Sequence, residues 1–150
     1  MPQSLVQLLC HIVFSTKDRR PLIPRDIRPR LYPYLGATLD GFGCRPIRIG
    51  GAEDHIHIAC ALWKNHAPCD IIEDIKKASS KWIKDLDGRF TGFYWQRGYS
   101  MFSVSPAHLR ALEDYIARQA EHHRKESFQD ELRRILKKYG VKYDERYLWD

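Results

Sequence analysis

The chain has 150 residues, a length that suits one compact domain with its own core. Hydrophobic residues make up 43% of the chain, which argues against long disordered segments. Lysine and arginine number 25 against 19 acidic residues, so the formal net charge is +6, and this balance favours an anionic partner such as nucleic acid. The sequence has no apolar run of ~18 residues and no signal-peptide pattern at its start, so we expect no membrane segment and a cytoplasmic location, with the cysteines as free thiols.

The first half of the chain alternates strand and helix patterns. Residues 5–14 are apolar and partly β-branched, which predicts a buried strand that leads into a basic loop. Apolar residues recur every four positions over 25–39 and indicate a helix, although Pro29 and Pro33 weaken this prediction. The next expected elements are a strand at 45–49, a turn at Gly50-Gly51 and a strand at 55–62.

The second half is expected to be mostly helical. An amphipathic helix is predicted over 70–86, and a hairpin or two short strands over the aromatic segment 90–104. Ser105-Pro106 is a typical helix start, for a helix over about 106–121. A second cap, S-x-x-D, begins a last helix over about 127–139, and the aromatic tail after it should dock on the rest of the protein.

The order of these elements predicts the fold class. Strand, helix, strand, strand, helix and strand, followed by helices, is the split β-α-β pattern of an α+β, ferredoxin-like α/β sandwich with an antiparallel sheet. We expect residues 1–150 to form a single domain in which helices cover one face of the sheet and leave the other face free for a ligand.

The most distinctive local feature is His55-Ile56-His57 on the third expected strand. Side chains alternate along a strand, so both imidazoles should project from one face while Ile56 points to the core. The pair could bind a divalent metal, take part in metal-free catalysis, or be two unrelated histidines on an exposed strand. A metal would need a third ligand, and Cys60 has the opposite parity. The absence of zinc-type spacing favours a hard ion with oxygen ligands.

A second pair lies on the helix that follows Ser105. Tyr115 and Gln119 are four residues apart and therefore share one helical face. Such pairs are common on ordinary helices, where the tyrosine is a boundary residue and the glutamine is solvated. In a catalytic interpretation, the phenol would attack a phosphodiester with help from a base or a metal, because its pKa is near ~10. The amide oxygen of Gln119 could then complete a metal site with the histidines.

Basic and aromatic side chains indicate where nucleic acid could bind. Phosphates would be drawn to basic surfaces, and exposed aromatic rings over 93–102 could stack on unpaired bases, although many of them should be core. The candidate DNA-binding residues are Lys17, Arg19, Arg20, Lys76, Lys77, Arg124 and Lys125.

With these residues in view, the sequence resembles the HUH-type single-tyrosine transposases of the smallest bacterial insertion sequences, the TnpA group. The resemblance spans essentially the whole chain. It is carried by the His55-Ile56-His57 motif and the run Gly50 to Asp54 before it, by the stretches Phe93 to Tyr99 and Phe102 to Ser105, by Tyr115 to Gln119 with His122 to Arg124, and by the ending Tyr143 to Asp150.

The resemblance implies a role for each matched residue. His55, His57 and Gln119 would bind Mg²⁺ or Mn²⁺, and Tyr115 would be the nucleophile that forms a 5′-phosphotyrosine. The family also implies cleavage and rejoining of single-stranded DNA during transposition, recognition of DNA hairpins at the element's ends, and a homodimer in which the tyrosine helix can serve the partner's histidines. It implies no nucleotide cofactor.

Two other classes of function fit the sequence less well than a transposase. Histidine-triad hydrolases need a third alternating histidine, and Ala59 occupies that place. A non-enzymatic ferredoxin-like module that binds nucleic acid would explain the charge and the fold. It would not explain why two histidines, a tyrosine and a glutamine should converge.

Overall fold

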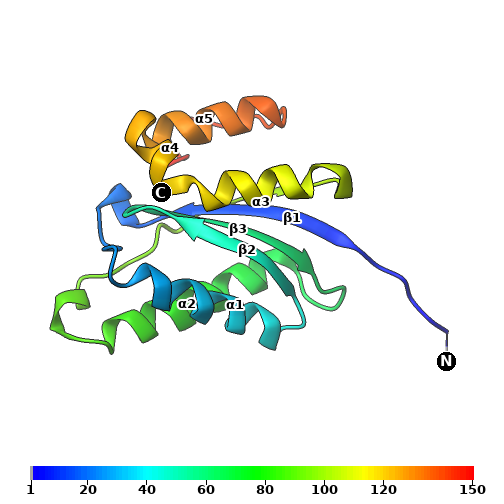
Figure 1. Ribbon diagram of the computed structural model, residues 1–150, viewed down its shortest axis with the longest axis horizontal. Helices are drawn as coiled ribbons and strands as arrows, with labels where there is room; N and C mark the ends of the chain where they lie inside the picture. Colours follow the sequence, from blue (N-terminus) through cyan, green and yellow to red (C-terminus); the bar gives the residue numbers. More distant parts are fainter. Residues whose placement is uncertain (1) are drawn as a thin grey trace.

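A four-stranded antiparallel sheet forms the centre of the computed structural model, which describes residues 2–150 (Figure 1). Its strands lie in the order β2-β3-β1-β4, and each pair of neighbours is antiparallel. The strands are β1 (Leu8–Ser15), β2 (Arg45–Gly51), β3 (His55–Leu62) and β4 (Ser100–Ser103). The predicted α+β sandwich with an antiparallel sheet is therefore confirmed.

One face of the sheet carries the main hydrophobic core. Alternate residues of the two central strands, such as Ile12, Phe14, Ile56 and Ile58, are fully buried there. The helices α1 (Arg28–Gly41) and α2 (Pro68–Lys84) cover this face. The predicted helix forms despite its two prolines. Pro29 lies in the first turn of α1, where its missing N–H breaks no helical hydrogen bond, and Pro33 lies inside the helix.

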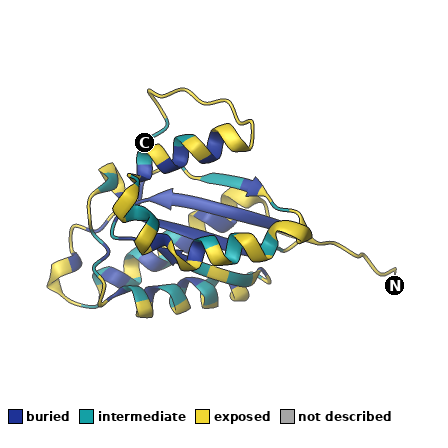
Figure 2. Ribbon diagram, turned by 45° about the horizontal axis from the view of Figure 1, so that its top comes forward, coloured by how far each residue is buried: buried dark blue, intermediate teal, exposed yellow. Residues whose placement is uncertain are grey.

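The other face of the sheet is not free, so this part of the prediction is wrong. Three helices cover it, namely α3 (Leu109–Ala117), α4 (Gln119–Lys125) and α5 (Phe128–Lys138) (Figure 1). The cause is a second hydrophobic cluster, in which α5 packs its apolar stripe on Val13 of β1 and Phe102 of β4. Burial of this stripe removes apolar surface from water and holds the C-terminal helices on the sheet. Figure 2 shows the buried, dark-blue strands between the two helical layers.

Several boundaries differ from the predictions. Gly50 and Gly51 belong to β2, and the turn follows them. The expected hairpin at 90–104 is a 3₁₀ turn at Gly88–Phe90, an irregular segment and the single strand β4. The predicted tyrosine helix at 106–121 is broken: a 3₁₀ turn at Pro106–His108 precedes α3, and Arg118 (φ −102°, ψ 19°) separates α3 from α4. No glycine or proline lies at this break, so its position was not visible in the sequence.

Other expectations for the C-terminal half hold. Ser127 caps α5 by accepting a hydrogen bond from the backbone N–H of Asp130 at 3.1 Å. The tail docks: the carbonyl of Asp150 accepts from the backbone N–H of Gly98 at 2.8 Å, and the Trp149 ring lies under the guanidinium of Arg19. Within residues 2–150, no helix has the length and apolarity that a bilayer crossing requires.

A close approach between β2 and α3 fixes the height of the tyrosine helix above the sheet. A Cβ atom at Gly50 would lie 2.6 Å from the carbonyl oxygen of Ile116 and 2.9 Å from its Cγ2 atom. Only glycine leaves room for this contact. The residue beside Ile116 is Tyr115, so the glycine on β2 sets how closely Tyr115 approaches the histidines of β3.

Candidate active site

The two histidines of β3 project from the face that α3, α4 and α5 cover. His55 and His57 are 1% and 0% exposed, and their ring centroids lie 5.1 Å apart. Ile56 between them is buried in the core on the opposite face, together with Cys60. The strand parity predicted from the sequence is therefore confirmed. The imidazoles lie beneath the C-terminal helices instead of on an exposed face.

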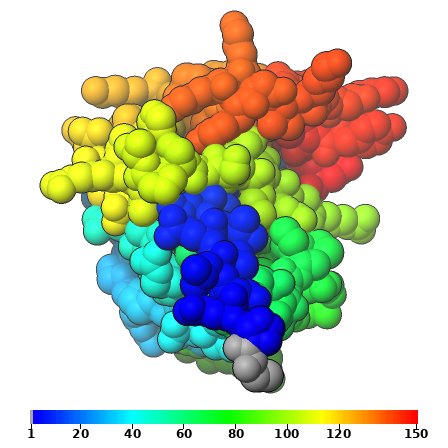
Figure 3. Space-filling model, turned by 90° about the vertical axis from the view of Figure 1, so that its right-hand side faces the viewer, coloured from blue at the N-terminus to red at the C-terminus, as the bar shows by residue number. Residues whose placement is uncertain are grey.

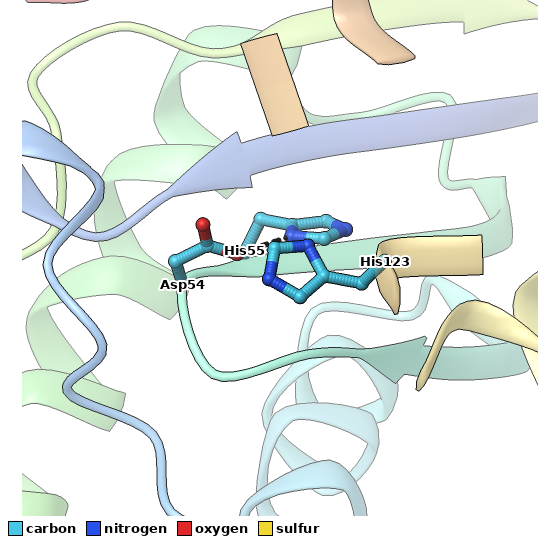
Figure 4. A group of neighbouring side chains, drawn as sticks. All are labelled: Asp54, His55 and His123. Atoms are coloured by element: carbon cyan, nitrogen blue, oxygen red, sulfur yellow. Dashed lines mark hydrogen bonds and ion pairs between the residues drawn. The ribbon is translucent and has the colours of Figure 1, made fainter. Parts of the chain in front are cut away.

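A partner on the Nδ1 side holds each imidazole ring. His55 Nδ1 lies 2.7 Å from Asp54 Oδ1 (Figure 4), and His57 Nδ1 lies 2.8 Å from His11 Nε2. His11 is itself buried and stacks on His57 with centroids 5.0 Å apart. With Nδ1 engaged, each ring presents its Nε2 atom to the space under α5. Such outer partners fix the tautomer and orientation of histidines that bind metals.

Two oxygen-bearing side chains meet these Nε2 atoms. Glu131 Oε1, from α5, lies 2.9 Å from His57 Nε2 and 3.3 Å from His55 Nε2. Gln119 Oε1, at the start of α4, lies 2.9 Å from His55 Nε2. Adjacent ligands of an octahedral ion with bonds of ~2.1 Å are about 3 Å apart. The spacing and chemistry of this nitrogen and oxygen donor set therefore fit a divalent cation, and His55, His57 and Glu131 form a possible metal site.

Tyr115 reaches the same cluster from α3. Its hydroxyl donates a hydrogen bond to Glu131 Oε2 and accepts one from Arg134 Nη2 at 2.9 Å. Gln119 Nε2 also donates to Glu131 Oε2, at 3.2 Å. The Tyr115 ring lies edge-on to His57, with centroids 5.8 Å apart. The structure thus brings together His55, His57, Tyr115 and Gln119 within one chain, and it adds Glu131 at their centre.

The charges in this cluster perturb one another strongly. Burial disfavours the charged form of His55, but the hydrogen bonds that His55 donates to Asp54 and Glu131, together with the negative charges of these two residues, outweigh burial and raise the pKa of His55 to about 9. Burial dominates at His11 and lowers its pKa to about 3. Burial also lowers the pKa of His57. For Tyr115, burial and the charge of Glu131 together raise the pKa of the phenol, which disfavours the phenolate.

A second group of possible metal ligands adjoins the first and consists of Asp54, His55 and His123 (Figure 4). His123 extends from α4 and lies close to His55, with ring centroids 5.5 Å apart. Its Nε2 atom lies 2.9 Å from Glu53 Oε1, and its Nδ1 atom lies 3.8 Å from Asp54 Oδ1. His123 therefore links α4 to the turn before β3 and covers the outer side of the cluster.

The predicted DNA-binding residues lie on three segments of the chain. Lys17, Arg19 and Arg20 follow β1, and Arg124 and Lys125 end α4. Lys76 and Lys77 lie on α2, on the opposite face of the sheet. Lys76 Nζ donates to the carbonyls of residues 96, 97 and 98, and Lys77 pairs with Glu73 at 2.9 Å. The two α2 lysines are thus already engaged with protein groups.

Sequence reasoning missed two residues of the cluster. Glu131 lies on the apolar stripe of α5, three residues after Phe128 and four before Ile135, and it is 3% exposed. A carboxylate in the middle of a buried stripe is a signal, because burial of a charge is costly unless it is paired. His11 carries a similar signal, since it interrupts an otherwise apolar strand pattern.

Comparison with known proteins identifies the family and supports the fold. Residues 4–119 match the family described as "Transposase IS200 like". Among solved structures, a protein of Deinococcus radiodurans R1 described as a candidate transposase shares 21% identity at a TM-score of 0.63, covering 80% of this chain and 96% of its own. A REP-associated tyrosine transposase, solved bound to a REP hairpin, shares 13% identity at a TM-score of 0.61, covering 82% of this chain and 73% of its own. No curated protein matches at a significant level.

The sandwich fold with paired histidines under a tyrosine helix defines an HUH tyrosine nuclease. The family match over residues 4–119 is more specific, and the chain belongs to the IS200-like transposase family. The predicted family and enzyme class are therefore confirmed.

The raised pKa of His55 makes the stability of the metal-free protein pH-dependent. A folded pKa of about 9 against 6.5 means that the stabilisation is complete below pH 6.5 and is lost as the pH rises through 9. We expect the His55 contribution to the free energy of unfolding, measured with urea and a chelator as the difference between the wild type and His55→Gln, to fall by about 2 kcal/mol between pH 6.5 and 8. The lowered pKa values of His11 and His57 act in the opposite direction over the same range. At higher pH, Lys76 raises the stability instead, because burial lowers its pKa to about 8.

Two variants test the assignment of this pH dependence. His55→Gln should remove most of the decline, whereas His66→Gln, at an exposed position, should leave it unchanged. An identical decline in the wild type and in His55→Gln would show that another group is responsible.

Proposed function

We propose that this transposase cleaves and rejoins single-stranded DNA through a phosphotyrosine on Tyr115, with a divalent cation held by His55, His57, Gln119 and Glu131. One observation carries the proposal. The carboxylate of Glu131 contacts both imidazoles and also accepts the hydrogen bond of the Tyr115 hydroxyl. Nucleophile and candidate metal ligands therefore share one buried group.

The reaction uses the phenol oxygen as the nucleophile. The Tyr115 oxygen attacks the phosphorus of a phosphodiester, and the bond from phosphorus to the 3′ oxygen breaks. The products are a 5′-phosphotyrosine and a free 3′-hydroxyl, which takes up a proton as the tyrosine loses one. The new linkage keeps the energy of the broken one, so the 3′-hydroxyl of an acceptor strand can attack it without ATP.

The donor set favours Mg²⁺ or Mn²⁺, because it combines oxygen ligands with imidazoles. Such a cation would polarise the phosphate and stabilise its developing charge. The residues around the site have supporting tasks. Asp54 and His11 orient the two imidazoles through Nδ1, and Arg134 donates to the Tyr115 hydroxyl at 2.9 Å. Arg134 thereby brings a positive charge to the position where the scissile phosphate must lie.

The substrate is proposed to be a DNA hairpin with a single-stranded flank at the element's end. The REP-associated relative was solved with a REP hairpin. In this chain, Arg124 and Lys125 are exposed at the end of α4, and further basic residues follow β1. These groups would contact phosphates, and the two engaged lysines of α2 would contribute less.

The first test is the loss of the nucleophile. Tyr115→Phe should form no denaturation-resistant protein–DNA adduct with single-stranded end DNA and Mg²⁺, because the attacking oxygen is absent. Binding of the same DNA should change less than about threefold, since phosphate contacts dominate affinity. Denaturing gels measure the adduct, and fluorescence anisotropy measures binding.

Tyr147→Phe is the matched control, because Tyr147 is 65% exposed in the tail. It should form the adduct like the wild type. If the wild type binds DNA but forms no adduct under any divalent cation, the chain is a binding module and the catalytic proposal fails.

The second test concerns Glu131 as a metal ligand. Glu131→Gln should bind Mn²⁺ at least tenfold more weakly than the wild type in calorimetry, because an anionic oxygen ligand is replaced by a neutral one. Glu121→Gln on α4, an exposed change of the same kind, should bind normally. Normal Mn²⁺ affinity in Glu131→Gln, together with loss of binding in His57→Ala, would remove Glu131 from the ligand set and leave the histidines in it.

The third test concerns catalysis within one chain. Tyr115 contacts Glu131 of its own chain, so we propose that a single subunit carries a complete site, while the homodimer stays a prediction. Equal amounts of Tyr115→Phe and His57→Ala should therefore form no adduct when mixed. This should hold whether light scattering shows the protein to be a monomer or a dimer. Adduct formation in the mixture would show that the tyrosine of one subunit serves the histidines of another.

A further inference from the structure

A cavity of about 400 Å³ opens beside Tyr115, between α3 and the C-terminal half of α5. Its floor includes His11 of β1, and the segment after β4 closes one side. In Figure 3 the yellow-green start of α3 and the orange end of α5 lie side by side over the blue β1. We infer that this cavity holds one unpaired nucleotide of the DNA strand, next to the phosphate that Tyr115 attacks. The inference rests on the proposed function.

The size of the cavity suits one nucleotide. Ligand pockets for small molecules span roughly 300–1,000 Å³, so about 400 Å³ lies at the small end of this range. Tyr115 itself is part of the wall. A strand whose phosphate lies at the Tyr115 hydroxyl therefore has its neighbouring nucleotide within reach of the cavity.

One wall offers a flat aromatic surface that is already fixed in place. Tyr139 lines the cavity, is 37% exposed, and stacks on Phe102 with centroids 4.5 Å apart and an interplanar angle of 8°. Leu112 and Ile135 add apolar surface to the wall. Unpaired bases stack on such rings with little dependence on their identity. A ring held by a neighbour loses less freedom when a base arrives.

The polar part of the wall suits a phosphodiester. Arg118, Arg134 and Lys138 line the cavity, and no carboxylate occurs among the described residues that line it. Arg134 is paired with Glu126 at 3.0 Å, whereas Lys138 and Arg118 have no ion pair within residues 2–150. Three cations beside an apolar wall are the combination that single-stranded nucleic acid requires.

The cavity is also linked to the site through His11. The ring that lines the cavity floor lies 2.8 Å from His57, a proposed metal ligand. An occupant of the cavity therefore contacts the residue that orients His57. A nucleotide in the cavity would therefore lie next to the reacting phosphate. The basic surface of α2, on the opposite face of the sheet, is too far away for this role.

The experiment compares two single-stranded probes of 12 nucleotides by fluorescence anisotropy, without added metal so that no strand is cut. One probe has mixed bases, and the other has the same backbone with abasic residues throughout. The wild type should bind the first at least about fivefold more tightly, since stacking of even one base gives a preference of this size. Ala111→Trp, which fills the cavity from an exposed position of α3, should remove most of that preference.

The control for this variant is Ala107→Trp, an equal change at an exposed position outside the cavity wall, which should keep the preference. Lys138→Ala should weaken the binding of both probes equally. It should also reduce the salt dependence of the binding constant by the amount expected for about one phosphate contact. Lys137→Ala, the neighbour outside the wall, should have a smaller effect on both.

Each outcome bears on one claim. If Ala111→Trp keeps the preference for bases, or if Ala107→Trp loses it equally, the cavity does not hold a nucleotide. Adduct formation by the wild type on end DNA is measured in parallel. A wild type that forms the adduct while Ala111→Trp keeps the preference overturns the cavity alone, and a wild type that forms no adduct overturns the proposed function, whatever the two probes show.

Discussion

The buried carboxylate of Glu131 is the interaction on which the arrangement of this site depends. It is 3% exposed and bonds both imidazoles of β3, the hydroxyl of Tyr115 and the amide of Gln119. Removal of a carboxylate from water costs several kcal/mol unless its partners compensate, and here the partners come from three separate elements. The same contacts therefore hold α3, α4 and α5 over the histidines and lower the pKa of Glu131 well below its ordinary value, against the effect of burial.

Two features of the backbone give this carboxylate its partners. The alternation of β3 directs His55 and His57 to one face while Ile56 and Ile58 anchor the strand in the core on the other. The glycine at position 50 then lets α3 approach β2 until Ile116 touches the sheet. A side chain at that position would lift the helix and move Tyr115 away from the imidazoles. Packing on the two faces of the sheet thus sets the distance between Tyr115 and the candidate metal ligands.

Local patterns made much of this predictable. The parity of His55 and His57, the cap at Ser127 and the docking of the aromatic tail all follow from residues close together in the chain, and all three are found. The features that could not be derived depend on tertiary contacts. The apolar stripe of α5 predicts burial but does not say against which surface, so the second face of the sheet was expected to be open. Glu131 was missed for the same reason, because its histidine partners lie on β3, and His57 is 74 residues away in the chain. The break at Arg118 has no local signal, and it is this break that starts α4 at Gln119.

The shared carboxylate would also connect a bound cation to Tyr115, the proposed nucleophile. Without a cation, the negative charge of Glu131 beside Tyr115 works with burial to raise the pKa of the phenol and so weakens it as a nucleophile. A cation among the Nε2 atoms would replace the Nε2 proton of His55 and offset the charge of Glu131, and both effects depend on the same four side chains. Reactivity of the tyrosine and occupancy of the metal site are then coupled by geometry alone. Under the proposed function, Tyr115 would therefore stay a weak nucleophile until metal and DNA are both bound.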